Sequence, residues 1–404
     1  MTTTVEIPRP PLDEVPSTDI DLHTDENLLD SLNVYARLRE LGPVVWLEKY
    51  QMYALTRFAE VTEVLKDWET YNSADGVVFN EYYNALKTTS LHTHGAEHDE
   101  IKHIESRPLA PDKLAELQPV LRSYAEDLVG KLAGRTTVDA VRDIAMPMPM
   151  DIVTNLVGLS DDVDRDDVYT WGVAAFNSAG PLHASRTMPG LECIGTFMTY
   201  AEKHIPDDIK PGGWAAQLFE NGRAAGWDEA KCRGVMLDYV FPSLDTTIHA
   251  MTAGLLLFAQ NPEQWQKVRA DRKLLKSAVY EIMRLASPAQ YFNRTVTRDV
   301  VLGGVNIPAG SRVLMMFGSA NRDEIVFPDP DRFDVERNPT NMVSWGGGKH
   351  ACLGKALARM ELTVLFDVLA DHYERFEAGA YTYEVNNNTR GLHYLELTLI
   401  PVGD

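Results

Sequence analysis

The run Ser344-Trp345-Gly346-Gly347-Gly348-Lys349-His350-Ala351-Cys352-Leu353-Gly354 decides the fold of this chain. Its glycines lack a Cβ, so the backbone can turn tightly and approach a flat ligand closely. Leu357, Met360 and Val364 recur at helical spacing directly after the run, which predicts a helix that begins there. The free N–H groups and the dipole at a helix N-terminus favour a thiolate, and a thiolate below such a loop suits the proximal ligand position of a haem iron. The alternative for Cys352 is a buried, inert cysteine in a glycine-rich turn.

The spacing resembles the signature of the cytochrome P450 superfamily, Phe-Gly-x-Gly-x-His-x-Cys-x-Gly. Gly346, Gly348, His350, Cys352 and Gly354 match it, while Trp345 replaces the usual phenylalanine and either hydrogen-bonds near the sulfur or only fills space. The resemblance implies a mainly α fold with small β-sheets, formed by residues 1–404 as one domain. It also implies haem b (iron protoporphyrin IX), held between a long central helix and the cysteine loop.

Composition excludes several other classes of protein. The 404 residues include 59 acidic and 38 basic side chains, for a formal net charge of −21, whereas a nucleic-acid partner needs a basic face. Cys193, Cys232 and Cys352 are too few for a disulfide framework, and their spacing fits no zinc motif. Ile7 to Pro11 looks like neither a signal peptide nor an anchor, and no N-terminal apolar run approaches the ~20 residues that span a bilayer. We therefore expect a cytoplasmic protein with no membrane or nucleic-acid partner.

Periodicity predicts a chain that is mostly helical after residue 59. The earlier part is predicted to start extended, then to form a helix over 31–41 and strands over 44–46 and 52–56. A loop is predicted over 71–97, and a long helix, buried on several sides, over 228–260. Short strands are predicted over 295–302, 305–310 and 313–316.

Two further motifs support the resemblance. Glu281 and Arg284 lie three apart, so they share a helical face and can pair. In the superfamily such a pair is joined by a second arginine before the cysteine, and Arg337 stands where that residue is expected. The resemblance gives this trio a structural role, which is to fix the loop that presents Cys352.

The second motif is Pro242-Ser243-Leu244-Asp245-Thr246-Thr247, inside the long helix. It resembles the family's segment over the distal face of the haem, although Pro242 and Ser243 replace small residues. Proline kinks a helix, and the Thr246 hydroxyl can bond back to the carbonyl four residues earlier. The resemblance implies that Thr246 holds a water near dioxygen and that Asp245 relays protons for heterolytic O–O cleavage. The alternative is a polar patch at a bend in a buried helix.

Four basic residues stand where the family binds the haem propionates. These are His98, Lys102, Arg294 and His350. Taken singly, each is more simply a solvated charge. His92 and His94 join His98 and His103 in a cluster whose spacing fits no compact metal site, so we interpret them as ordinary surface or loop histidines.

Several stretches of the chain look similar to bacterial monooxygenases that hydroxylate or O-demethylate para-substituted benzoates. In those relatives a basic residue and a serine before the haem-binding helix hold the carboxylate, and Lys87 and Ser90 match them approximately. Leu237 and Asp238 replace the Arg-Ser that assists them. Asp238 lies eight residues before Thr246, roughly 12 Å along a helix. A buried aspartate repels a carboxylate but accepts a hydrogen bond from a phenol, unless Lys87 neutralises it or Asp238 faces away from the pocket.

The substrate hypothesis is therefore a small methoxylated or alkylated aromatic compound, either a guaiacol-type phenol or a para-substituted benzoate. Its pocket is predicted to include Phe176, Phe241, Ser243, Ala289 and Phe292, for which plain core packing is the alternative. A different small hydrophobic substrate, such as a terpenoid, is the runner-up.

The reaction needs O2 and two electrons, and the chain contains no flavin-binding or Gly-x-Gly-x-x-Gly segment. The resemblance implies an iron–sulfur ferredoxin with an NAD(P)H-dependent reductase. Lys349, Lys355 and Arg359 are the candidates for a basic docking face near the cysteine, or else scattered solvated cations. Rival functions are a haem-thiolate ligand-binding or sensor protein, peroxide-driven chemistry, and a haem-free thiol hydrolase using Cys352.

Overall fold

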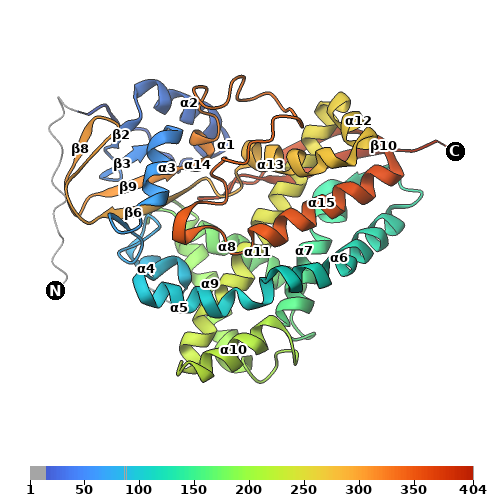
Figure 1. Cartoon of the computed structure of the whole chain (residues 1–404), viewed down its shortest axis with the longest axis horizontal. Helices are drawn as coiled ribbons and strands as arrows, with labels where there is room; N and C mark the ends of the chain where they lie inside the picture. Colours follow the sequence, from blue (N-terminus) through green and yellow to red (C-terminus); the bar gives the residue numbers. More distant parts are fainter. Residues whose placement is uncertain (1–14, 86, 88, 404) are drawn as a thin grey trace.

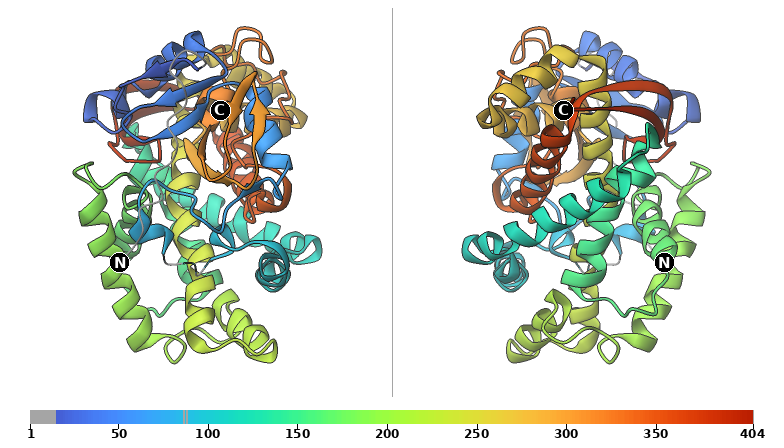
Figure 2. Two further views of the ribbon diagram at one scale, coloured as in Figure 1. Left: turned by 90° about the vertical axis from the view of Figure 1, so that its left-hand side faces the viewer. Right: turned by 90° about the vertical axis from the view of Figure 1, so that its right-hand side faces the viewer.

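A long buried helix, α11 (Glu229–Gln260), runs through the middle of the molecule (Figure 2). The computed structural model describes residues 15–85, 87 and 89–403. The Asp228 side chain accepts a hydrogen bond from the Lys231 N–H and so caps the start of α11. Because apolar side chains occur on all its faces, α11 is buried on several sides, as predicted.

Several of the remaining helices pack against α11, whereas those nearest the N-terminus lie beside the largest sheet (Figure 1). The remaining helices are α1 (Asp25–Leu29), α2 (Ser31–Leu41), α3 (Phe58–Lys66), α4 (Glu81–Asn84), α5 (Gly95–Glu105), α6 (Pro111–Leu132), α7 (Pro147–Asp151), α8 (Arg165–Asn177), α9 (Thr187–His204), α10 (Trp214–Ala224), α12 (Pro262–Ala270), α13 (Leu275–Ala286), α14 (Phe317–Ala320) and α15 (Lys355–His372). Short 3₁₀ turns lie at Ser90–His92, Arg107–Leu109, Arg272–Leu274 and Gly348–His350, and π-helical segments at Ala140–Ala145 and Ile152–Val157.

Three small sheets occur within the described residues. The largest has the order β1 (Ser17–Thr18), β2 (Val44–Leu47), β3 (Met52–Leu55), β9 (Arg312–Met316), β6 (Tyr291–Val296) and β4 (Tyr71–Asn72). The second has the order β10 (Tyr373–Tyr383), β11 (Leu392–Pro401) and β5 (Thr137–Asp139), and the third pairs β7 (Val300–Leu302) with β8 (Val305–Ile307). The fold is thus mainly α with small sheets, as predicted.

The largest sheet is covered on both faces because its side chains alternate between them. Val44 and Trp46 of β2 join a core cluster with Val61 and Val64 of α3. Val45 and Leu47 point the other way, into a cluster with residues of α2. On β6, Phe292 and Arg294 are two apart and both line the same cavity. The sheet therefore supports the site as well as the core.

The predicted elements agree with the structure where a local pattern is strong. The helix α2 ends at Leu41 as predicted, and the prediction for α11 differs by one residue at its start. The loop predicted over 71–97 is wrong in part, because it contains β4, α4 and the start of α5. The strand predicted over 295–302 is two strands, since residues 297–299 turn between β6 and β7. The hairpin of β10 and β11 was not predicted.

No described helix combines the length and the hydropathy that a bilayer crossing requires. The N-terminal run from Ile7 to Pro11, on which the prediction of no signal peptide rests, lies outside the described residues.

Alanine substitutions at two helical glycines, one of them a control, test the packing around α11. A Cβ at Gly254 of α11 would meet the rings and side chains of Phe366 and Ile282 within 3.0 Å, whereas one at Gly195 of α9 meets nothing within 4 Å. Gly254→Ala is expected to destabilise the protein by about 1–3 kcal/mol through overpacking. Gly195→Ala is expected to stabilise it by up to about 1 kcal/mol through helix propensity. Urea unfolding of both variants checks this, and equal shifts of the same sign would contradict it.

Candidate functional site

The loop before Cys352 follows a path that requires glycine. Gly346 and Gly348 have φ values of 62° and 59°, in the left-handed region. A Cβ at Gly348 would also collide with the carbonyl oxygen of Leu65, at the end of α3. The loop then returns so that the Cys352 N–H donates to the Trp345 carbonyl at 2.9 Å. These contacts hold the cysteine directly before α15.

Two opposing effects act on the sulfur of Cys352. Burial raises the pKa of the Cys352 thiol, although Lys102 and the N–H groups of Gly354 and Lys355 oppose that rise. The N–H groups at the helix end thus favour the thiolate, as predicted, while the desolvation of a negative charge is the larger effect and opposes them. A bound metal cation supplies the missing positive charge and deprotonates a coordinating thiol.

Cys352 opens into a cavity of about 1450 Å³, counted as all atom-free space and including its solvent-open part. The cysteine loop, α15 and Ala289 to Arg294 contribute to its wall, and α11 contributes Pro242, Ser243, Thr246, Thr247 and Ala250. The thiol lies on this wall, and not in the packed core, so the alternative of an inert core cysteine is not supported. Trp345 lines the same cavity and packs edge-on against Tyr280, with ring centroids 5.4 Å apart.

All four predicted propionate-binding residues, His98, Lys102, Arg294 and His350, line this cavity. Both ring nitrogens of His98 lie near carbonyl oxygens, at 2.9 Å from Ser90 and 3.1 Å from Lys349. These two contacts hold the His98 ring between the segment before α5 and the cysteine loop. The His350 ring lies 4.2 Å from the His98 ring, and burial together with the charge of Arg294 lowers its pKa to about 2.

Arg294 gives the strongest indication of an anionic ligand. The guanidinium is buried, and burial lowers its pKa to about 10. Its hydrogen bond within the described residues goes to the neighbouring Asn293 carbonyl, at 2.7 Å, and no carboxylate pairs with it there. A buried cation without a counter-ion is costly, so this wall fits a flat apolar group that carries carboxylates. The residues present therefore fit haem b, with Cys352 as the ligand to its iron.

The predicted ion-pair trio is present. Arg284 donates to both oxygens of Glu281 at 2.8 Å, and the Arg337 Nε donates to Glu281 Oε1 at 3.0 Å. Glu281 and Arg284 are both fully buried. Arg284 also donates to the Asn321 carbonyl at 2.9 Å, and the Asn321 side chain donates to the Ser344 hydroxyl at 2.8 Å. The trio is thereby tied to the first residue of the cysteine loop.

The residues of the Pro242–Thr247 motif lie on two different sides of α11. The Thr246 hydroxyl donates to the Pro242 carbonyl at 2.7 Å, as predicted, and Thr246 lines the cavity. The Ser243 hydroxyl likewise donates to the Tyr239 carbonyl. Asp245 is fully buried and is absent from the lining of the cavity. The helix is continuous through Pro242.

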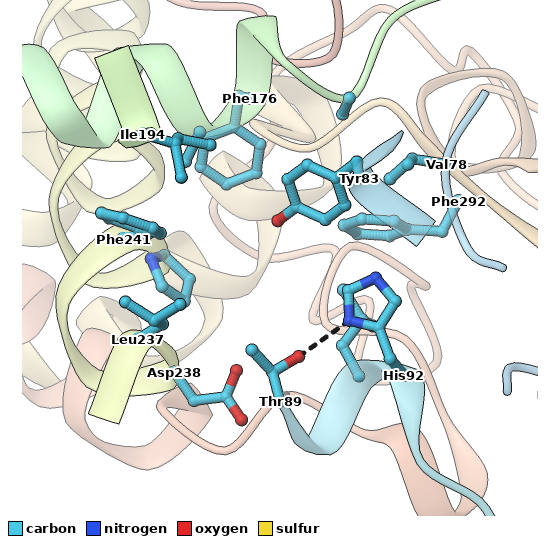
Figure 3. Close-up of a pocket in the computed structure, with 14 residues that line it drawn as sticks. Val78, Tyr83, Thr89, His92, Phe176, Ile194, Leu237, Asp238, Phe241 and Phe292 are labelled. Atoms are coloured by element: carbon cyan, nitrogen blue, oxygen red, sulfur yellow. Dashed lines mark hydrogen bonds between the residues drawn. The ribbon is translucent and has the colours of Figure 1, made fainter. Parts of the chain in front are cut away.

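A second cavity, of about 710 Å³ by the same measure, adjoins the first and shares Phe176, Asp238, Pro242 and Phe292 with it. Figure 3 shows the carboxylate of Asp238 and the hydroxyl of Thr89 at one end of the cavity. Aromatic rings form much of the remaining wall, and they belong to Tyr83, Phe176, Phe241 and Phe292. Ala289 and Ser243 line only the first cavity, and Phe241 only the second.

Asp238 faces the cavities and belongs to an acidic cluster. Its Oδ2 accepts a hydrogen bond from the Ser90 N–H at 2.8 Å, so Ser90 acts here through its backbone. Burial, then the charge of Asp238, raises the pKa of Glu105 to about 8, while Lys102, 3.2 Å away, opposes the rise. Asp238 therefore adjoins a carboxyl group that is largely neutral at pH 7.

Two predictions about the loop before α5 need correction. Lys87 is exposed and is absent from the described lining of both cavities, so the structure does not bring it to Asp238. His92, interpreted as a surface or loop histidine, is buried and lines the second cavity. Its Nδ1 lies 3.0 Å from the Thr89 hydroxyl, and its Nε2 has no hydrogen-bond partner among the described residues. Burial, followed by the charges of Arg294 and Lys87, lowers its pKa to about 4, so the ring is neutral.

Other proteins share both the sequence and the fold. The chain is 31% identical to cytochrome p450 CYP199A2 of Rhodopseudomonas palustris over 394 residues, which covers 96% of this chain and 95% of that protein. The chain belongs to the cytochrome P450 superfamily. The cytochrome P450 family model matches residues 216–378, which include Cys352 and α11. Linalool 8-monooxygenase of Pseudomonas putida is 28% identical, over 94% of this chain and 98% of that enzyme.

Solved structures of the superfamily agree in fold. Cytochrome P450 CYP109Q5 from Chondromyces apiculatus superimposes with a TM-score of 0.79 at 25% identity, over 96% of this chain and 99% of that one. CYP109E1 from Bacillus megaterium, in complex with testosterone, gives a TM-score of 0.82 at 21% identity, over 93% and 99%. The chain is thus a cytochrome P450 monooxygenase, and its cofactor is haem b.

The buried trio provides a test of how the cysteine loop is held. Glu281→Gln keeps the shape of the side chain but leaves two guanidinium groups without a counter-charge, which costs about 3–5 kcal/mol when a buried pair is broken. We expect a lower urea midpoint and loss of haem on gel filtration. Glu126→Gln, in the exposed pair with Arg122, is the control and is expected to change little. Full haem retention and an unchanged midpoint in Glu281→Gln would contradict the role of the trio.

Proposed function

We propose that this P450 hydroxylates or O-demethylates a small methoxylated or alkylated monocyclic aromatic compound. Of the two predicted classes, a guaiacol-type phenol is favoured over a para-substituted benzoate. The observation that carries the proposal is the carboxylate of Asp238 in the wall of two adjoining cavities whose other walls are rich in aromatic rings.

The electrostatics of the cavities favour a hydrogen-bond donor on the substrate. Asp238 adjoins Glu105, whose pKa is raised by burial and by Asp238, so a benzoate there would bring a second negative charge close to the Asp238 carboxylate. A phenol brings an O–H that the Asp238 carboxylate can accept. Lys87, which would have favoured a benzoate, is exposed and outside the lining. His92 offers a second polar contact, since its Nε2 has no described partner.

The shape of the cavities favours a single ring. Phe176 and Phe292 line both cavities, so a flat substrate can pack against their rings while it extends from one cavity into the other. Asp238 precedes Thr246 by eight residues on the continuous helix α11, roughly 12 Å along its axis. A ring held at Asp238 can therefore present its para or meta substituent near Thr246.

The residues around this substrate have separate tasks. When bound, haem b supplies O2 activation with a thiolate that favours O–O cleavage. Thr246 offers a hydroxyl on the cavity side of α11, and we propose that it orients a water there, with Asp245 as the source of protons. For a methoxy substrate, hydroxylation of the methyl carbon yields an unstable hemiacetal that releases formaldehyde. Electrons are proposed to come from an iron–sulfur ferredoxin and its NAD(P)H-dependent reductase.

The proposed ferredoxin surface has only partial support. Lys355 and Arg359, at the start of α15, lie over the rings of Trp345 and Tyr280 respectively. Lys349 pairs instead with Asp99 at 2.8 Å and lies over Trp68. The docking proposal therefore rests on Lys355 and Arg359 more than on Lys349.

A terpenoid is the second candidate substrate. It is favoured by the similarity to linalool 8-monooxygenase and by the apolar part of the lining. A hydrocarbon-like substrate leaves Asp238 and His92 Nε2 without a new partner, which costs binding energy. That cost is the reason for placing the phenol first.

The substrate proposal predicts a specificity change in one variant. Asp238→Asn removes the charge but keeps the shape, so affinity for a methoxybenzoate is expected to rise and affinity for the matching methoxyphenol to fall. The ratio of the two is expected to move roughly tenfold or more, because hydrogen bonds to charged groups contribute about 1.5–3 kcal/mol. Spectral titration of the ferric protein with 4-methoxyphenol and 4-methoxybenzoate measures both affinities.

Asp167→Asn is the matched control, because Asp167 is an exposed acid on α8 and lines neither cavity. It lowers the net negative charge equally and is expected to leave the ratio unchanged. If the ratio stays the same in Asp238→Asn, or if a monoterpene alcohol binds far more tightly than either aromatic compound, the substrate proposal is wrong.

A further inference from the structure

Asp245 belongs to a buried cluster of titratable groups that the proposed chemistry does not otherwise use. Its Oδ1 lies 2.9 Å from Nε2 of His249, one turn along α11, and its Oδ2 accepts a hydrogen bond from the Thr389 hydroxyl at 2.7 Å. Nε2 of His249 is also 3.8 Å from Oε2 of Glu384. The side chains of Asp245 and His249 are each 1% exposed, whereas that of Glu384 is 14% exposed. The cluster thus extends from the buried helix toward solvent.

The C-terminal segment leaves space for this imidazole. A Cβ at Gly391 would overlap the ring of His249, so glycine is required there while the ring keeps its place. Glu384 and Thr389 come from the same segment, between β10 and β11. Thr389 also forms an isolated β-bridge with Ala289, which lines the cavity of Cys352. One segment therefore contacts both the acidic group on α11 and the wall of the cavity.

Monooxygenation creates a demand for protons at this helix. The reaction RH + O2 + 2 e⁻ + 2 H⁺ → ROH + H2O consumes two protons in each turnover, and the electrons come from the reductase system. Asp245 is fully buried, so it can supply protons repeatedly only if another group reprotonates it. Among the described residues, the titratable groups in contact with it are His249 and, through His249, Glu384.

We propose that Glu384 and His249 form the route by which protons from solvent reach Asp245. His249 donates the proton on Nε2 to Oδ1 of Asp245, and Asp245 then passes a proton on to the Thr246 side of the helix. Glu384 then returns a proton to the same nitrogen and is itself reprotonated by water. His249 is a positioning residue, because it lines neither cavity and acts through Asp245.

The charges around the cluster support proton exchange near neutral pH. Burial lowers the pKa of His249, but Asp245 and then Glu384 more than offset burial, so the net pKa is raised. Burial, then the charge of Asp245, raises the pKa of Glu384 to about 7, against the effect of His249. Arg390 faces His249 and opposes its protonation. Burial is the main cause that raises the pKa of Tyr169 of α8. The charges of Glu384 and Asp245 raise this pKa further, and Arg142 opposes the rise.

The same three ligand atoms lie within 4.8 Å of one another, a spacing that also suits a metal ion. Two observations favour a proton instead. The Asp245 and His249 atoms are 2.9 Å apart, close enough to share a proton although their geometry is not that of a regular hydrogen bond, and Oδ2 of Asp245 is occupied by Thr389. The positive charge of Arg390 beside His249 would also repel a cation.

The experiment compares His249→Asn with the wild type in turnover with NADH, ferredoxin and reductase. The substrate is whichever methoxyphenol or methoxybenzoate the wild type converts fastest. We expect product formation at least tenfold slower in His249→Asn, with a larger solvent isotope effect. The wild-type rate is expected to fall as pH rises through the range in which Glu384 loses its proton, and the variant is expected to lose that pH dependence. Glu384→Gln should lose the pH dependence with a smaller fall in rate.

His393→Asn, an exposed histidine of β11, is the control and should behave as the wild type. A slow His249→Asn enzyme with the wild-type isotope effect and pH profile would show a merely structural role and overturn the proposal. His249→Gln replaces His249→Asn if the latter does not fold. One equivalent of zinc in the purified wild type, absent from His249→Asn, would also overturn it.

A second measurement does not depend on the substrate. Nuclear magnetic resonance of protein labelled with ¹⁵N-histidine, assigned through His249→Asn, follows the His249 ring in the resting protein. The ring is expected to lose its proton at a higher pH than a free histidine, and at a different pH in Glu384→Gln. A ring that titrates as a free histidine in both proteins would contradict the route, even if no tested aromatic compound is a substrate.

Discussion

The site depends on the buried carboxylate of Glu281, which pairs with two guanidinium groups. Glu281 accepts from Arg284 and Arg337, and the backbone N–H of Asp334 approaches the same oxygen at 3.3 Å. Such a group is costly to bury unless every partner is in place, so the network has one favourable arrangement. The Asn321 side chain accepts a hydrogen bond from the Val343 N–H and donates one to the Ser344 hydroxyl, and so links the network to the start of the cysteine loop. The position of the sulfur is thus fixed by hydrogen bonds that start on α13.

The two ends of the cavity system differ in charge, and this difference separates two binding tasks. Lys102 and Arg294 give one wall a positive potential, which suits the carboxylates of haem. Asp238 gives another part of the lining a negative potential, with Glu105 behind it. Lys102 pairs with Glu105 at 3.2 Å and so lies between the two regions. A neutral aromatic substrate with a hydrogen-bond donor avoids competing with haem for the cationic wall.

Local spacing explains what the sequence could predict. The glycines around Cys352, the pairing of Glu281 with Arg284, and the bond from Thr246 to Pro242 all follow from separations of a few residues. Helix geometry turns these separations into contacts, so pattern and structure agree.

Contacts over long separations were not predictable in the same way. Thr389 reaches Asp245 across 144 positions, and nothing in the segment from Asn386 to Gly391 has a period that indicates this contact. His92 appeared to be a surface or loop histidine because its burial is decided by α8, α11 and β6, which also line its cavity. The prediction of Lys87 at the pocket rests on its approximate position in the sequence. A position in a loop does not determine where a side chain points.

The C-terminal hairpin has a consequence for biosynthesis. Chains are made from the N-terminus, and early segments begin to fold before late ones exist. Here Cys352 and the partners of α11 at 384, 389 and 391 are all made more than 90 residues after α11 ends at Gln260. The nascent protein therefore cannot complete the surroundings of Asp245 and His249 until residues 384–391 have been made. Removal of the segment from Glu384 onward would take away Glu384 and Thr389, the partners of His249 and Asp245, together with β11.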